Sequence, residues 1–107
     1  MDRVFFSSSA KDPPSVVSAR CSGTTSALDQ MNKYFFHQQM PVVTSRYWNM
    51  VHGNTPEEVK QDQEGLQIMR VLGRNMAWML KLKEAGTAAG ILYPKQEEIR
   101  IAANFIR

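Results

Sequence analysis

The chain has 107 residues, 43% hydrophobic and 21% charged, a balance typical of one soluble globular domain with a modest core and unlike that of a disordered chain. The formal net charge at pH 7 is +3, but basic and acidic residues are interspersed, which is typical of an ordinary solvated surface and argues against a nucleic-acid-binding tail. With one cysteine and two histidines, the sequence predicts neither a structural zinc site nor an iron–sulfur cluster.

The composition along the chain favours a location away from membranes. No apolar run approaches the roughly 20 residues that span a bilayer, and the first residues, MDRVFFSSSAKD, lack the basic and apolar regions of a secretory signal. Cys21 has no second cysteine with which to form an internal disulfide, which agrees with a reducing compartment. We therefore expect a cytoplasmic protein.

The first predicted elements are a helix end and a strand. Residues 1–8, MDRVFFSS, are typical of the last turns of a helix whose apolar residues need cover. A proline pair at 13–14 breaks the chain. Ser15–Ala19 is a short β-branched run that leads into a loop of small residues, RCSGTT, and this pattern predicts a strand.

A helix is predicted from Thr25 to Met40. Its apolar residues follow helical spacing at Leu28, Met31, Phe35 and Met40. Ser26, with Asp29 three residues later, matches a capping box near its start. Pro41 stops the helix, and the run PVVTS, from Pro41 to Ser45, predicts a second buried strand.

Two more helices are predicted in the second half of the chain. The first begins after Thr55 as N-cap, with Pro56 in the first turn and Glu58 at the third position. The second runs from Glu64 to Ala85 and carries one broad apolar face, formed by Leu66, Met69, Leu72, Met76, Met79 and Leu80. Such a face predicts packing on a flat surface, and Gly86 and Gly90 are candidate caps at the end of the helix.

The alternation of buried strands with helices predicts an α/β fold with a parallel sheet, because parallel strands need crossover helices between them. Two parallel strands alone leave open edges and cannot cover two long helices. We therefore expect other strands to complete the sheet. They come either from a partner chain or from the first half of a larger domain.

Four segments carry a resemblance to a known family. They are VVSARCSGTTSALDQMNKYF, MPVVTSRYWNMVHGNTPEEV, EGLQIMRVLGRNMAWMLKLKEAG and the terminal NFIR. In this order they resemble the C-terminal half of the NAD(P)H-dependent FMN reductases of the flavodoxin-like fold. The resemblance implies a three-layer domain with a five-stranded parallel sheet, of which residues 1–107 are the C-terminal part with the last two strands and their helices. It also implies that the N-terminal half with the phosphate-binding loop is absent here.

The resemblance implies an FMN-dependent oxidoreductase of the flavin or quinone reductase type. Hydride would pass from NAD(P)H through N5 of FMN to a small-molecule acceptor, in a protein that forms homo-oligomers and binds neither nucleic acid nor membranes. An alternative is a catalytically silent fragment of such a flavoprotein, which acts only as an oligomer-forming or structural piece. A third reading, a basic α/β binding module without a cofactor, has little support from the scattered charges.

The first candidate site is the loop after the first predicted strand, because ligands of doubly wound sheets lie at the carboxyl ends of the strands. The small or hydrogen-bonding residues there would let backbone N–H groups approach a flavin ring and tune its potential: Ser18, Ala19, Arg20, Ser22, Gly23, Thr24 and Thr25. On the residues alone, SGTT is better explained as a plain helix N-cap and Arg20 as a surface charge. The family often carries a second arginine where this chain has Cys21, which reads as an inert small residue.

The second candidate site is the loop SRYWNMVHG, Ser45–Gly53. Tyr47 and Trp48 offer broad surfaces suited to a flavin edge or a planar acceptor. Asn49 and His52 could hydrogen-bond a substrate oxygen, and His52 is the candidate catalytic residue because it could carry a proton near neutral pH. The competing interpretation is that Tyr47, Trp48 and Met50 seal a subunit interface, where aromatic residues and Met are enriched. His37 is expected to be an ordinary surface histidine.

Overall fold

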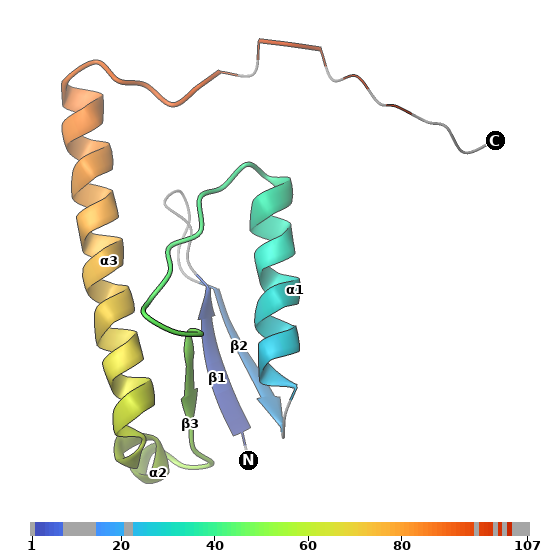
Figure 1. Ribbon diagram of the computed structural model, residues 1–107, viewed down its shortest axis with the longest axis vertical. Coiled ribbons are helices and arrows are strands. Elements are labelled where there is room, and N and C mark those ends of the chain that lie inside the picture. Colours follow the sequence, from blue (N-terminus) through green and yellow to red (C-terminus); the bar gives the residue numbers. More distant parts are fainter. Residues whose placement is uncertain are drawn as a thin grey trace.

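The computed structural model describes residues 2–7, 15–20, 23–95, 97–99, 101 and 103. Its strands are β1 (Asp2–Ser7), β2 (Ser15–Arg20) and β3 (Met50–His52). Its helices are α1 (Thr24–His37), α2 (Pro56–Gln61) and α3 (Gln63–Ala88), and Figure 1 shows their arrangement. The predicted combination of helices and strands, α/β in the broad sense, is confirmed.

The described strands form a sheet in the order β2-β1-β3, and β1 is antiparallel to both neighbours. The predicted sheet of two neighbouring parallel strands is therefore wrong for the described residues, and so is the helix end predicted at residues 1–8. The reason lies in the Val-Phe-Phe run of β1, because these residues favour strands. Pairing with β2 along all six residues gives their backbone groups partners.

The second predicted strand, Pro41–Ser45, is also wrong, since the strand in this part of the chain begins only at Met50. Two hydrogen bonds tie the earlier segment to α3 instead. Asn75 Nδ2 donates to Thr44 O over 2.8 Å, and Ser45 Oγ donates to Ile68 O over 2.7 Å. Residues 41–45 therefore connect α1 to β3 along the side of α3.

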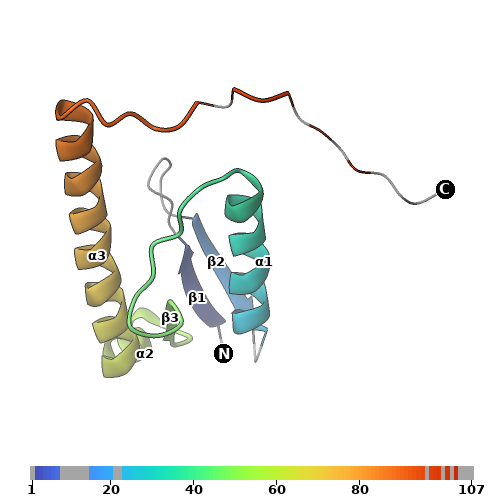
Figure 2. The same cartoon turned by 45° about the horizontal axis from the view of Figure 1, so that its top comes forward.

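β2 and β3 run in the same direction, because each is antiparallel to β1 (Figure 1). Arg3 of β1 pairs with Ala19 on one side and with His52 on the other. The carboxyl ends of β2 and β3 therefore lie at the same edge of the sheet, about 10 Å apart across β1. α1 begins close to the end of β2, at this same edge (Figure 2).

α1 covers part of the sheet with its apolar side. Leu28 of the helix and Met50 of β3 form the centre of a small core, and Val17 and Ala19 of β2 pack against it. Phe35, two residues before the end of the helix, is also buried. The helical spacing in the sequence thus predicted the buried side of α1 correctly.

Both ends of α1 differ from the prediction. The N-cap is Gly23 and makes no side-chain cap, so the predicted capping box of Ser26 and Asp29 is wrong. The helix ends at His37 because Gln39 has a φ of 56°, in the left-handed region. The N–H of Met40 then donates to Phe35 O and closes the end of the helix.

The predicted start of α2 is confirmed. Thr55 is its N-cap and accepts a hydrogen bond from the Glu58 N–H over 3.3 Å. The Glu58 carboxylate reaches back and accepts the N–H of Asn54 over 2.7 Å. This reciprocal pair resembles a capping box and fixes the turn after β3.

α3 has 26 residues and is therefore about 39 Å long, but only its first half packs against the sheet. Gly65, Ile68 and Leu72 are its buried residues. In the second half the side chains of Trp78, Leu80 and Leu82 are 60%, 51% and 47% exposed. Of the apolar face predicted for this helix, Leu72 is buried, Leu80 is exposed and the other four residues are half-buried, so the face is only partly covered.

The end of α3 lies at the second of the two predicted glycines. Gly86 is inside the helix, whereas Gly90 follows the C-cap with a φ of 84°. The Gly90 N–H donates to Thr87 O and the Ile91 N–H donates to Gly86 O. This is a Schellman motif, which needs the left-handed conformation that glycine adopts at little cost.

The approach of α3 to β3 depends on a glycine. A Cβ at Gly65 would lie 2.9 Å from the Cα of Val51 and would overlap the Asp62 carboxylate. A Cβ at Gly73, two turns further along the same helix, would meet no atom within 4 Å. The two positions are therefore a matched pair for testing the packing of the helix.

We expect Gly65→Ala and Gly73→Ala to change stability in opposite directions. Gly65→Ala should lower the free energy of unfolding by about 1 to 3 kcal/mol, because it forces β3 and α3 apart. Gly73→Ala should raise it by about 0.5 to 1 kcal/mol, because alanine favours the helix and meets no obstacle. Urea unfolding of both variants measures these changes. Equal effects at the two positions would contradict the close approach.

Candidate functional site

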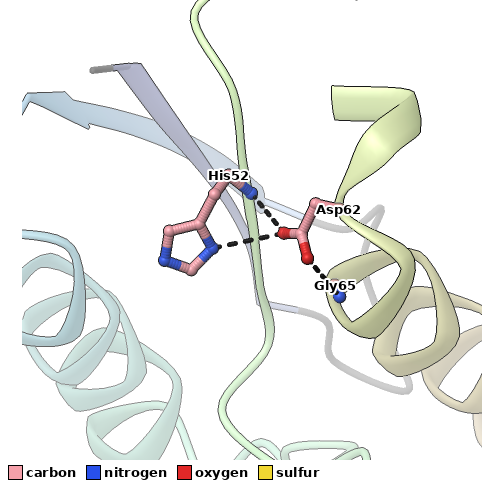
Figure 3. Close-up of polar contacts among 3 residues, drawn as sticks. All are labelled: His52, Asp62 and Gly65. Carbon is pink, nitrogen blue, oxygen red and sulfur yellow. Dashed lines mark hydrogen bonds and ion pairs between the residues drawn. The ribbon is translucent and has the colours of Figure 1, made fainter. Parts of the chain in front are cut away.

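The candidate site forms where the last residue of β3 meets the start of α3. Oδ2 of Asp62 accepts the main-chain N–H of His52 over 2.8 Å and lies 3.3 Å from Nδ1 of the same histidine. Oδ1 accepts the N–H of Gly65 over 2.9 Å (Figure 3). One carboxylate thus holds both the backbone and the ring of the histidine that the sequence singled out.

Asp62 has a structural role as well, because it is the N-cap of α3. Burial alone would raise the pKa of Asp62, but hydrogen bonds from the Gly65 and His52 N–H groups and from the His52 ring outweigh it and lower the pKa from its ordinary value of 3.8. At neutral pH the group is therefore an anion that can only accept hydrogen bonds.

The His52–Asp62 pair borders a small pocket, called here the His52 pocket, of about 50 Å³. Its lining comes from the loop before β3, from β3 itself and from the start of α3: Tyr47, Met50, His52, Asp62, Glu64, Gly65 and Ile68. Arg46 lies 3.6 Å from the Glu64 carboxylate at this end of α3. The volume is enough for a water molecule or two but not for a flavin ring, so a ring could meet His52 only from outside the pocket.

Tyr47 and Trp48 form an exposed aromatic pair. Their ring centroids are 4.9 Å apart with an interplanar angle of 62°, an edge-to-face arrangement. The two residues are 55% and 52% exposed. Their surfaces are thus accessible to a planar ligand or to another subunit, and both interpretations made from the sequence stay open.

Asn49 is buried, so its predicted contact with a substrate stays a prediction that the described residues do not support. The residue is only 6% exposed. The Met50 N–H donates to Trp48 O over 2.8 Å, which makes a tight turn centred on Asn49. This turn leaves Trp48 outside and takes Asn49 inside, where Oδ1 has no hydrogen-bond partner among the described residues.

The residues predicted to contact a flavin divide into three groups. Ser18, Gly23 and Thr25 are exposed or half-buried near the end of β2 and the start of α1. Ala19 packs toward the core and Thr24 is only 1% exposed, so their side chains are turned inward. The Arg20 side chain and the whole of Ser22, like Cys21, lie outside the described residues.

The structure brings the two predicted sites to one edge of the sheet, but it also adds a residue that the sequence analysis missed. Asp62 was overlooked because it lies ten residues after His52, in a polar run before the long helix. The signal that could have found it is an Asp at the N-cap position before a long apolar-periodic helix. That signal indicates the cap alone and not the contact with β3.

Comparison with known proteins adds no relative, since no family model, curated protein or solved structure matches the chain. Within the described residues, no helix combines the length and apolar character that crossing a membrane requires. The same part of the chain contains no group of three or more His, Cys, Asp or Glu side chains placed to hold a metal ion.

The lowered pKa of Asp62 predicts a stability contribution that depends on pH. Since the pKa of the folded state lies below 3.8, the contribution is complete above that value and is lost as the pH falls through the folded pKa. Asp62→Asn keeps one capping oxygen but cannot accept all three hydrogen bonds. We expect it to lower the free energy of unfolding by about 1 to 2 kcal/mol at pH 7, and by less near pH 3.

Urea unfolding of the wild-type chain and of Asp62→Asn at pH 7, 5 and 3 measures this difference. At pH 5 the difference should be at least as large as at pH 7, because the carboxyl is ionised at both pH values in the folded and the unfolded state. A difference of the same size at pH 3 as at pH 7 would show that the ionised carboxylate is not what stabilises the fold.

Proposed function

We propose that the chain is the C-terminal part of a cytoplasmic, flavodoxin-like oxidoreductase that uses FMN and NAD(P)H and reduces a small-molecule acceptor. The resemblance of the four segments to NAD(P)H-dependent FMN reductases supports this function. The observation that carries the proposal is that the end of β2 and His52 at the end of β3 share one sheet edge, on either side of Arg3. That edge is where doubly wound sheets bind their ligands.

The connection between β2 and β3 also supports a flavodoxin-like origin. The two strands point in the same direction and α1 links them, as in a β-α-β unit. In a complete domain of this kind, β2 and β3 would pair directly and residues 2–7 would leave the sheet. The proposed fold and the described sheet therefore differ mainly in β1, which lies between β2 and β3 in the described sheet.

The described residues fit one part of an FMN molecule. Gly23 provides no side-chain cap, so the first N–H groups of α1 have no acceptor from their own N-cap residue. With Ser18 and Thr25 close by in sequence, these donors suit the carbonyl oxygens of the flavin pyrimidine edge. No described segment contains a glycine-rich phosphate loop. The chain therefore fits the ring edge and not the phosphate group.

When bound, FMN would supply the hydride acceptor at N5. The chain's own residues would bind and orient. The first turn of α1 would hold the pyrimidine edge, and the exposed rings of Tyr47 and Trp48 would offer a flat surface to the acceptor. His52, whose side chain is 37% exposed, would exchange a proton with the acceptor.

We expect the chain to bind FMN weakly and without using the phosphate group. The dissociation constant should exceed about 10 µM, because the anion site of this fold contributes several kcal/mol of affinity. Riboflavin, which lacks the phosphate, should bind within about threefold of FMN for the same reason. Titrations followed by flavin fluorescence measure both constants.

Two outcomes of these titrations would contradict the proposal in different ways. If neither flavin binds at millimolar concentration, the chain holds no flavin ring and the proposed function is wrong. If FMN binds below 1 µM and at least tenfold more tightly than riboflavin, the chain has a phosphate site of its own. The assignment of the described residues to the ring edge alone would then be wrong.

The second candidate function is a catalytically silent piece that assembles with other copies. The observation that favours it is the exposed apolar surface on the second half of α3, where Trp78, Leu80 and Leu82 are 60%, 51% and 47% exposed. An apolar groove of about 390 Å³ lies between the end of α3 and the following residues, lined among others by Met79, Leu82, Ile91 and Leu92. Exposed apolar surface of this extent promotes association.

We therefore expect the chain to form oligomers rather than 12.2 kDa monomers, with the second half of α3 in the contact. Trp78→Glu and Leu82→Glu should shift the chain toward monomers, because each places a charge on the apolar surface. Trp48→Ala is the matched control and should leave the mass unchanged if the Tyr47–Trp48 pair serves a ligand. Size exclusion with light scattering measures the mass. A monodisperse wild-type monomer would contradict this prediction.

A further inference from the structure

We infer that Asp62 is a positioning residue for His52: it fixes the neutral imidazole as the Nδ1–H tautomer and leaves Nε2 as the nitrogen that exchanges a proton. The use of that proton rests on the proposed function. The choice of tautomer does not, because it follows from contacts within the chain.

The Asp62 carboxylate has little freedom to rotate. Oδ2 accepts the His52 main-chain N–H over 2.8 Å and Oδ1 accepts the Gly65 N–H over 2.9 Å. These two bonds reach different elements, β3 and α3, so neither oxygen can turn away without breaking one of them (Figure 3). The carboxylate therefore keeps one orientation, with Oδ2 beside the ring.

The position of the proton on the His52 ring follows from this fixed orientation. Nδ1 of His52 lies 3.3 Å from Oδ2. An ionised carboxylate only accepts hydrogen bonds, so a favourable contact requires Nδ1 to carry the hydrogen. In a neutral imidazole the other nitrogen, Nε2, is then the acceptor. The ring nitrogen that is not joined to Asp62 points away from the carboxylate in Figure 3, and the side chain is 37% exposed.

Close backbone packing at two glycines holds His52 and Asp62 together. A Cβ at Gly65 would overlap the Asp62 carboxylate, and a Cβ at Gly53 would lie 2.6 Å from the main-chain nitrogen of Val59. Glycine at both positions lets the end of β3 lie directly against the helices that follow it. The short distance between His52 and Asp62 thus depends on backbone packing as well as on the pair itself.

The competing interpretation is that Asp62 is only a helix cap. Thr55 shows what a cap alone requires, since its side chain accepts one hydrogen bond from Glu58 within its own helix. Asp62 accepts such a bond with Oδ1, from Gly65 of its own helix. Its Oδ2 additionally accepts the main-chain N–H of His52 in β3. Serine caps a helix as well as aspartate does, but its shorter side chain carries only one oxygen. Asp62→Ser therefore separates the two roles.

The charged neighbours of the His52 pocket are Glu64 and, paired with it at 3.6 Å, Arg46. Both are on the solvent side, with side chains 71% and 49% exposed. Their interactions with the ring are weakened by water. The contact with Asp62, whose side chain is 20% exposed, therefore determines the tautomer.

The test is a long-range proton–nitrogen NMR correlation spectrum of the full chain at a pH where histidine is neutral. His37 is the internal reference, because Nε2 of Gln38 lies 3.3 Å from its Nδ1, and an amide nitrogen that donates there favours the Nε2–H form. We expect the nitrogen shifts of the wild-type chain to show mostly Nδ1–H for His52 and mostly Nε2–H for His37.

Asp62→Ser should reverse the ratio for His52 to mostly Nε2–H, the form that a free histidine side chain prefers in water. Thr55→Ala, which removes a helix cap without touching the ring, should leave the His52 shifts as in the wild type. The inference is overturned if wild-type His52 is mostly Nε2–H, or if Asp62→Ser keeps the wild-type ratio.

The flavin titration distinguishes a failure of this inference from a failure of the proposed function. If His52 has the expected tautomer and no flavin binds, the positioning by Asp62 stands and the oxidoreductase proposal is wrong. If riboflavin binds and the tautomer of His52 does not depend on Asp62, the inference is wrong and the proposed function keeps its support.

Discussion

The carboxylate of Asp62 is the interaction on which the rest of this structure depends. It caps α3 through Gly65 and holds the end of β3 through His52, so the helix and the strand have a fixed relative position. Ile68 and Leu72 can then be buried beside the sheet, and Ser45 reaches the backbone of α3. This polar contact thus fixes the positions of the apolar residues around it, because the carboxylate is hydrogen-bonded to the backbone of both α3 and β3.

The helices were predictable from the sequence and the sheet was not. Periodic apolar residues and Thr55 placed α1 and α2 to within a few residues, since these signals are local. Strand pairing depends on contacts between distant segments. The β-branched run at 15–19 can pair with a parallel or an antiparallel strand. It pairs with residues 2–7, which were predicted to be the end of a helix despite their strand propensity.

The sequence could identify only those residues of the candidate site whose chemistry does not depend on their neighbours. His52, Tyr47 and Trp48 were singled out by residue type, and the structure leaves all three accessible in part. The burial of Asn49 was not visible in the sequence, because it depends on the turn between Trp48 and Met50. Asp62 was missed because its contact with His52 joins two elements. A sequence pattern indicates which groups are reactive, whereas only the packing indicates which of them meet.

The uneven packing of α3 gives one continuous helix two different local stabilities. The first half shares the core with β3, while the second half, from Trp78 to the cap at Gly90, is supported mainly by its own hydrogen bonds. Opening of the backbone should therefore start at the free end and stop near Leu72 without loss of the fold. A binding partner that covers the free end would gain part of its effect by suppressing this opening, so ordering of the helix and association would be thermodynamically linked.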